Sequence, residues 1–208
     1  MGVPKGKRKL SRFEAAHHYY RLRSEVTNLM LQDFGFSEEK YRKSIERYRE
    51  VHKSAPNVNE VVARYEKKCQ AFIKWFIDRE CDAVLEILRN IETEFTLGNS
   101  IYPSETPAKL FEFIVRRWHM NKAIGYCYTL KQELNYIIRS LPVDINKFER
   151  FSEAIDKQIS LYRGVRQSDN RLIKPKKNGT FEEDIFRIFD GIASVIRRIG
   201  RIEAQENK

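Results

Sequence analysis

The sequence predicts an all-α protein: an antiparallel helix bundle with extra N-terminal helices and an appended C-terminal helix. Three observations predict this class. Apolar residues recur at intervals of three and four along most of the 208-residue chain, the spacing of one helix face. Glycine (9) and proline (6) are scarce, which argues against the many tight turns of an all-β sandwich. No run of strict apolar–polar alternation competes with the helical pattern.

For residues 1–57 the sequence predicts a basic N-terminal segment followed by two helices. Ser11 and Glu14 form a capping box, in which each side chain satisfies a free backbone N–H of the first turn. The first helix reaches about residue 33, with an apolar face made of Ala15, Tyr19, Leu22, Val26, Leu29 and Met30. Gly35 breaks it, and Ser37 begins a second helix. The face of that helix is Tyr41, Ile45 and Tyr48.

For residues 58–166 the sequence predicts the bundle core, which consists of three helices. Because short connections join these helices, we expect neighbouring helices to be antiparallel. The first runs over 58–95 until Gly98 stops it. Its face is Val61, Tyr65, Cys69, Phe72, Phe76, Ala83, Ile87, Ile91 and Phe95. The second runs over 107–141, and Gly125 within it marks a close helix contact or a bend. Its face is Leu110, Ile114, Trp118, Cys127, Leu130, Leu134, Ile137 and Leu141.

The third core helix follows Pro142 and is capped by Asp144. Its predicted face is Phe148, Phe151, Ile155, Ile159 and Tyr162. Residues 167–208 form the last unit. A basic linker over 166–179 leads to a capping box at Thr180–Glu183, which opens a helix with an isoleucine-rich face.

Positive charge is concentrated in two segments. The formal net charge is +10, and residues 1–12 and 163–177 each contribute +5, so the rest of the chain is neutral. A solvated surface usually mixes its signs, and clusters of this kind are where a phosphate backbone binds. The alternative is two basic tails that only aid solubility.

Two further basic groups belong to predicted helices. Trp118 is expected on the buried stripe, which leaves Arg116, Arg117 and Lys122 on the outer face. Arginines near residue 200 form a basic side of the last helix. The predicted nucleic-acid-binding residues are Lys5, Lys7, Arg8, Lys9, Arg12, Arg116, Arg117, Lys122, Arg163, Arg166, Arg171, Lys174, Lys176, Lys177, Arg197, Arg198 and Arg201.

Motifs for catalysis, cofactors or metals are not found, so we expect no catalytic residue, no cofactor and no metal. Phosphate-binding glycine loops and nucleophile elbows are missing. The three cysteines, Cys69, Cys81 and Cys127, form no CxxC pair and fit a reducing cytosol. No membrane span or signal peptide is recognised, so a cytoplasmic protein is expected.

One aromatic stretch, residues 17–21, has two interpretations. Its aromatic and cationic side chains suit exposed bases, so it could form a base-stacking surface. Alternatively Tyr19 enters the core while His17 and Arg21 stay exposed, which is the interpretation we favour.

Residues 76–165 resemble a family of small four-helix bundles. The family includes the accessory variability determinant of diversity-generating retroelements and proteins encoded within bacterial ribosomal RNA insertions. The matching segments are Arg79–Leu88, Lys122–Ile124, Leu130–Arg139, Pro142–Asp144, Phe151–Ile159 and Tyr162–Val165. Where the family commonly ends its last helix in a glycine–aromatic pair, Val165 follows Gly164 here. Residues 1–57 and 181–203 fall outside the resemblance.

The resemblance implies a basic homo-oligomer, often a pentamer. Such a protein binds a reverse transcriptase and its template RNA, or an RNA–DNA duplex, and contributes no catalytic residue. Three alternatives stay open: a helical small subunit of a CRISPR-type RNA-guided complex, a structural oligomer or phage component, and a metal-dependent nuclease. The last would use scattered acids such as Glu80, Glu112 and Asp156.

Overall fold

The computed structural model describes residues 12–102 and 109–170, and these residues confirm the all-α class. They form five α-helices and a short 3-10 helix, with no strand among them. In chain order these are α1 (Arg12–Met30), the 3-10 helix η2 (Asp33–Gly35), α2 (Glu38–Val51), α3 (Val58–Ser100), α4 (Lys109–Ser140) and α5 (Asn146–Asn170).

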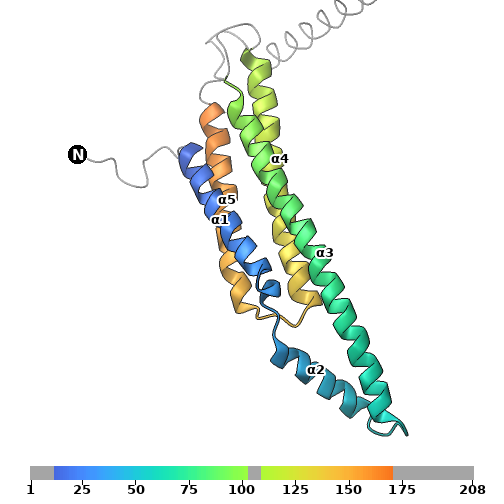
Figure 1. Ribbon diagram of the computed structural model, residues 1–208. Helices are drawn as coiled ribbons and strands as arrows, with labels where there is room; N and C mark the ends of the chain where they lie inside the picture. The colour runs from blue at the N-terminus through green and yellow to red at the C-terminus, as the bar shows by residue number, and fades with distance from the viewer. Residues whose placement is uncertain (1–11, 103–108, 171–208) are drawn as a thin grey trace, which may run out of the picture.

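Four helices form an antiparallel bundle: α1, the second half of α3, α4 and α5 (Figure 1). Their inward faces make one continuous apolar core. All six predicted face residues of α1 and all five of α5 are buried, which confirms both faces. Tyr19 lies in this core and its hydroxyl donates to the carbonyl of Leu88. His17 and Arg21 are exposed, as the favoured interpretation of this stretch predicts.

The bundle does not coincide with the predicted core range 58–166. Helix α1, which the sequence placed in the N-terminal unit, supplies the fourth helix because its apolar face packs against α5 and α3. The first half of α3 lies outside the bundle and packs against α2 instead. We call residues 37–75, which comprise α2 and this half of α3, the arm.

A small separate cluster holds the arm together. Tyr41, Ile45 and Val62 are buried between α2 and α3. The rings of Tyr48 and Tyr65 stack with their centroids 3.8 Å apart. Ser37 caps α2 as predicted, since its side chain accepts from the backbone N–H of Lys40.

The arm joins the bundle through a tight turn that ends at Gly35. The predicted break at Gly35 is present, although α1 itself ends earlier, at Met30. Asp33, Phe34 and Gly35 all have positive φ, a conformation that only glycine adopts at little cost. Phe34 is fully buried and anchors this turn. The turn is also bonded to the α4–α5 connection, because Ser37 N–H donates to Pro142 O at 2.9 Å.

The predicted face of α3 is confirmed at Phe76, Ile91 and Phe95, which are buried, and is wrong by about one position between Phe76 and Ile91. Val84 and Leu88 are fully buried there, whereas Ala83 and Ile87 are only half-buried, because α3 packs against both α1 and α4. Gly98 does not stop the helix, which continues to Ser100. A Cβ at Gly98 would lie 3.0 Å from Met120 Cε and 3.2 Å from Arg116 O.

Gly98 therefore provides the close helix contact that was predicted at Gly125. At Gly125, no described atom of another helix lies within 4 Å of where a Cβ would stand. The basic linker was predicted from residue 166, but α5 continues to Asn170. Ser11 and the predicted elements at 103–108 and 171–208 lie outside the described residues.

Candidate nucleic-acid interface

Five of the predicted nucleic-acid-binding side chains are described: Arg116, Arg117, Lys122, Arg163 and Arg166. Arg12 is the first residue of α1. The others lie outside the described residues. They are Lys5, Lys7, Arg8, Lys9, Arg171, Lys174, Lys176, Lys177, Arg197, Arg198 and Arg201.

Three of the five gather along the seam between α4 and α5. Arg163 Nη2 donates to the hydroxyl of Tyr128 at 2.6 Å, and Arg166 Nη1 donates to Asn121 Oδ1 at 2.7 Å. Arg117 is exposed and shares a helix stripe with Asn121 and Tyr128, since it precedes them by four and eleven residues. We call Arg117, Arg163 and Arg166 the seam cations.

The predicted outer-face position of Arg116 is wrong. Its side chain is fully buried, and its Nε lies 2.9 Å from Oδ2 of Asp169, which is 3% exposed as a residue. Trp118 is instead half exposed, at 52%. The buried residues of this part of α4 are Phe113, Arg116 and Met120. The face that packs against the end of α5 is therefore a different one from the predicted face, which contained Trp118. Arg116 therefore fastens α4 to α5 and presents no charge to a ligand.

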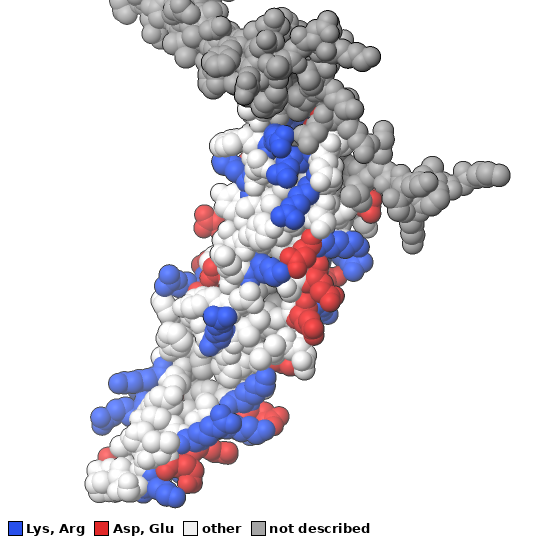
Figure 2. Space-filling view, turned by 180° about the vertical axis from the view of Figure 1, so that it is seen from behind, with Lys and Arg blue, Asp and Glu red and all other residues white. Residues whose placement is uncertain are grey.

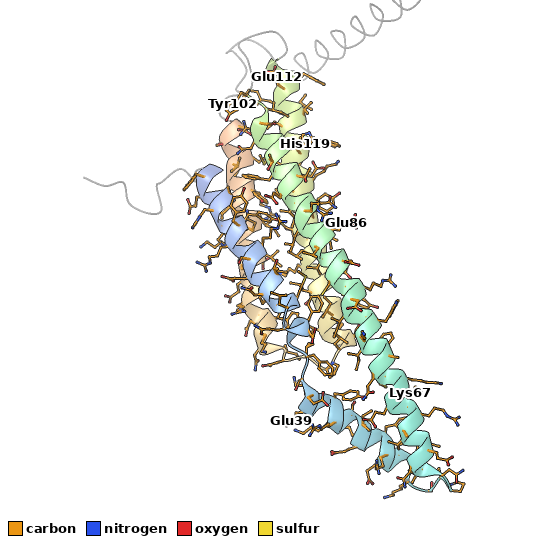
Figure 3. All side chains as sticks on the ribbon, in the orientation of Figure 1. Glu39, Lys67, Glu86, Tyr102, Glu112 and His119 are labelled. Carbon is orange, nitrogen blue, oxygen red and sulfur yellow. The ribbon has the colours of Figure 1, made fainter. Side chains whose placement is uncertain are left out.

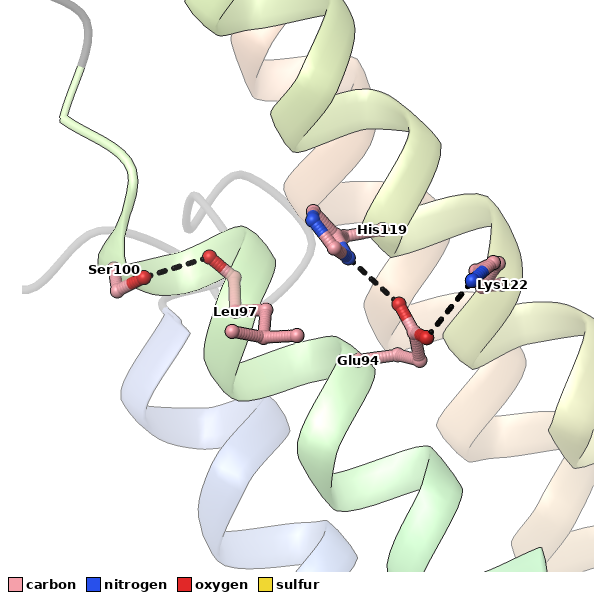
Figure 4. A network of polar contacts seen from close by, with 5 residues as sticks. All are labelled: Glu94, Leu97, Ser100, His119 and Lys122. Carbon is pink, nitrogen blue, oxygen red and sulfur yellow. Dashed lines mark hydrogen bonds and ion pairs between the residues drawn. The ribbon is translucent and has the colours of Figure 1, made fainter.

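Lys122 is likewise engaged within the protein. Its Nζ lies 3.2 Å from Glu94 Oε1 and 3.9 Å from the centre of the Trp118 ring. The other Glu94 oxygen, Oε2, lies 2.7 Å from His119 Nδ1 (Figure 4). Burial acts to raise the pKa of Glu94, but the hydrogen bonds from His119 and Lys122 outweigh it and the pKa is lowered overall. Lys122 is thus the partner of an ionised carboxylate on α3.

The two predicted basic segments leave the described structure at the same end of the bundle. Gln158 of α5 donates to Ala15 O at 3.1 Å and its Oε1 lies 2.7 Å from His18 Nδ1, so the start of α1 lies beside α5. Asp169, at the end of α5, contacts α4. Figure 1 shows the start of α1 and the end of α5 side by side. Residues 1–11 and 171–177 are therefore attached at the same end of the bundle, and Arg166 lies four residues before the end of α5.

A second surface was missed by the sequence analysis. On α3, Arg64, Lys67, Lys68 and Arg79 are exposed, and with them Phe72 and Trp75 at 48% and 52%. Phe72 was predicted to be buried, but the arm contains no helix that covers this side of α3. The signal available in the sequence was the alternation of cations and aromatic residues at helical spacing, which is typical of nucleic-acid-binding surfaces.

The acids proposed for a nuclease are not gathered. Asp156 on α5 lies 2.7 Å from Lys131 Nζ, and Glu112 lies near the start of α4 (Figure 3). Glu80 on α3 faces Glu133 on α4, and burial, the hydrogen bond to Glu133 and its negative charge raise the pKa of Glu80 to about 7. Within residues 12–102 and 109–170, no three His, Cys, Asp or Glu side chains are grouped as a metal site would require.

The three cysteines lie on α3 and α4. Cys69, Cys81 and Cys127 are all free thiols, and burial raises the pKa of Cys127 to about 12. In the part of the chain that the structure describes, none of the helices combines the length and the apolar character needed to cross a membrane.

Comparison with known proteins gave no relative. No protein-family model, no curated protein and no solved structure matches this chain.

Proposed function

We propose that this protein is a non-catalytic RNA-binding accessory subunit. The proposal rests on one observation: both basic segments are attached at the same end of the bundle, and the three seam cations lie in the half of the bundle next to that end. The rest of the chain carries no net charge. A strand of RNA bound at that end would meet positive charge from α4, from α5 and from both segments. Contacts of this kind position a phosphate backbone without reading its sequence.

We further propose that its partners are a reverse transcriptase and its template RNA in a diversity-generating retroelement. The support is the resemblance of residues 76–165, which span the second half of α3, α4 and α5. A reverse transcriptase gene beside the gene for this chain, with a repeated template region, would support this assignment. Neighbouring CRISPR-associated genes would favour the small-subunit alternative.

A protein partner or a homo-oligomer has a candidate surface on α4. Phe111, Ile114 and Trp118 are spaced by three and four residues and are each about half exposed. Exposed apolar patches often mark protein–protein contacts. The same stripe favours the second candidate function, a structural oligomer that does not bind RNA.

The two candidates differ in their response to salt. RNA affinity is measured by fluorescence anisotropy of an end-labelled single strand over a range of salt concentrations. We expect Lys5→Gln/Lys7→Gln/Arg8→Gln/Lys9→Gln to weaken binding. The salt slope, which is the steepness with which log affinity falls with log salt concentration, should decrease by about 3, because each lost phosphate contact removes about 0.7. A second variant, with glutamine at the five cationic residues Arg166, Arg171, Lys174, Lys176 and Lys177, should behave alike.

A matched control changes cations that already have partners. Arg42 and Lys43 on α2 pair with Glu38 and Glu39, so Arg42→Gln/Lys43→Gln should leave the slope unchanged. The structural-oligomer candidate predicts weak RNA binding and no steep slope in any variant. Unchanged affinity in both charge variants would reject the RNA-binding proposal.

A further inference from the structure

We propose that the exposed side of α3 in and next to the arm is a second RNA contact, which binds unpaired bases of a single strand. The surface consists of Arg64, Lys67, Lys68, Phe72, Trp75 and Arg79, and we call it the α3 ridge. The inference rests on the proposed RNA-binding function and adds to it a site and a substrate class, single-stranded rather than duplex RNA.

The ridge residues share one side of a single straight element. Steps of three, four and seven residues separate Arg64, Lys67, Lys68 and Trp75, which places them on one face of α3. The opposite side of the same stretch packs on α2 through Val62, Tyr65 and Cys69. The ridge is therefore the solvent side of the arm (Figure 3, where Lys67 is labelled).

Among the described residues, the cations of the ridge form no ion pair with a neighbouring carboxylate. None of its four basic side chains lies within 4.0 Å of a carboxylate oxygen of the described residues. On α2, by contrast, Arg42, Lys43 and Lys53 each pair with a glutamate of their own helix. Figure 2 shows basic side chains projecting from the arm. Glu60 and Asp78 flank the ridge near its two ends, so the middle of the ridge is the most positive part.

The two aromatic residues of the ridge, Phe72 and Trp75, are supported by packing against a buried ring. The Phe72 ring lies 5.6 Å from that of Phe76, which is buried and in turn packs edge-on against Tyr136 of α4. Trp75 lies 5.8 Å from Phe72, and the guanidinium of Arg79 sits 5.3 Å from the Trp75 ring centre. Two half-exposed rings beside unpaired cations are the arrangement on which single-stranded bases stack while the backbone meets the charges.

The ridge and the seam cations lie at different levels along the bundle. Arg166 bonds Asn121, whose neighbour Lys122 reaches Glu94 of α3. From Lys68 to Glu94 the helix rises about 39 Å at about 1.5 Å per residue. A stacked strand rises about 3.4 Å per nucleotide, so about 11 nucleotides span from Lys68 to the level of Arg166. Arg163 bonds Tyr128 near the middle of α4, so it lies closer to the ridge than Arg166 does.

A second copy of the chain fits this surface less well. A symmetric dimer would bring the same positive face of each copy together, and like charges across an interface oppose association. Single-stranded RNA complements both the charge and the rings.

The chain contains two tryptophans, which gives a direct test. In Trp118→Phe, Trp75 is the one remaining tryptophan, and we expect its emission to fall as single-stranded RNA of about 20 nucleotides saturates the protein, following the anisotropy curve. Duplex RNA should bind without this loss of emission. The matched variant Trp75→Phe reports Trp118, whose emission should change little. Trp75 emission that is unchanged at saturation, or quenched equally by duplex RNA, would overturn the proposal.

Affinity measurements separate this site from the bundle end. Phe72→Ala/Trp75→Ala should weaken binding of a 20-nucleotide strand by at least about fivefold, since one base stack contributes that much. Arg64→Gln/Lys67→Gln/Lys68→Gln should lower its salt slope by about 2. Full affinity in the ridge variants, with losses in the bundle-end variants, would reject the ridge and keep the proposed function. A changed oligomeric state with full RNA affinity would assign the ridge to a second copy, and no RNA binding by the unaltered chain would reject both proposals.

Discussion

Arg116 and Asp169 form a buried ion pair, with Nε and Oδ2 2.9 Å apart and side chains 0% and 4% exposed. The pair joins the first turns of α4 to the last turn of α5. It thereby fixes the part of α5 that carries Arg163 and Arg166 against the part of α4 that carries Arg117. The seam cations are held together by a charge pair that is itself inaccessible to RNA.

Removing one member of this pair should destabilise the bundle. Asp169→Ala leaves the Arg116 guanidinium buried without this carboxylate, and such losses typically cost about 3–5 kcal/mol. Urea denaturation followed by circular dichroism measures the free energy of unfolding. The double variant Arg116→Met/Asp169→Leu should be less destabilised than Asp169→Ala, because no uncompensated charge remains. Equal stability of Asp169→Ala and the unaltered protein would contradict the role of the pair.

Glu80 should make stability fall as pH rises. Its pKa is raised to about 7, so the folded protein prefers the protonated side chain. The stabilisation is fully present below the ordinary carboxyl pKa of the unfolded chain, and it is lost as pH rises through about 7. Glu80→Gln keeps a neutral side chain at every pH and should gain about 1–3 kcal/mol over the unaltered protein at pH 8. Little difference is expected at pH 5, and an equal difference at both pH values would refute this assignment.

Glu94 has the opposite dependence. Its pKa is lowered because the bonds from His119 and Lys122 outweigh the effect of burial, so its contribution is present at neutral pH and is lost as pH falls through the lowered pKa. Lys122→Gln should reduce the free energy of unfolding at pH 7 but leave RNA affinity unchanged, since its charge already serves Glu94. Thermal unfolding and anisotropy on the same preparation distinguish these effects. A loss of RNA affinity without a loss of stability would show instead that Lys122 contacts RNA, as the sequence predicted.

The core placement of α5 can be tested at Ile155, which is fully buried. Ile155→Asp should abolish cooperative unfolding, because burying a lone carboxylate costs several kcal/mol or more. Lys157→Asp, on the exposed side of the same helix, is the control for introducing the charge. A soluble and fully helical Ile155→Asp variant would contradict the core.

Helix positions follow from the sequence because apolar spacing and the signals at Ser37 and Gly35 are local. The faces of α1 and α5 also follow, since each buries one continuous stripe. For α4 the apolar spacing predicts the wrong buried face near residue 118. Trp118 fits the spacing but is half exposed, whereas Arg116 is buried. Nothing local distinguishes Arg116 from Arg117; the difference is the carboxylate of Asp169 on another helix.

The exposure of the α3 ridge could not be predicted for a related reason, although its alternation of cations and aromatic residues is visible in the sequence. Phe72 has the spacing of a core residue, and only the arrangement of the arm shows that no described helix covers it. Conversely, the two remote basic segments are attached at the same end of the bundle because α1 and α5 are neighbours. That relation arises from packing, as the Gln158–Ala15 bond shows, and charge counting alone does not contain it.

The most direct test of the central claim is the salt dependence of RNA affinity for the unaltered protein and the two bundle-end charge variants. We predict that log affinity falls steeply and linearly with log salt concentration, and that each variant is both weaker and less steep. Equal affinities and equal slopes in all three proteins would show that the basic end of the bundle does not bind RNA.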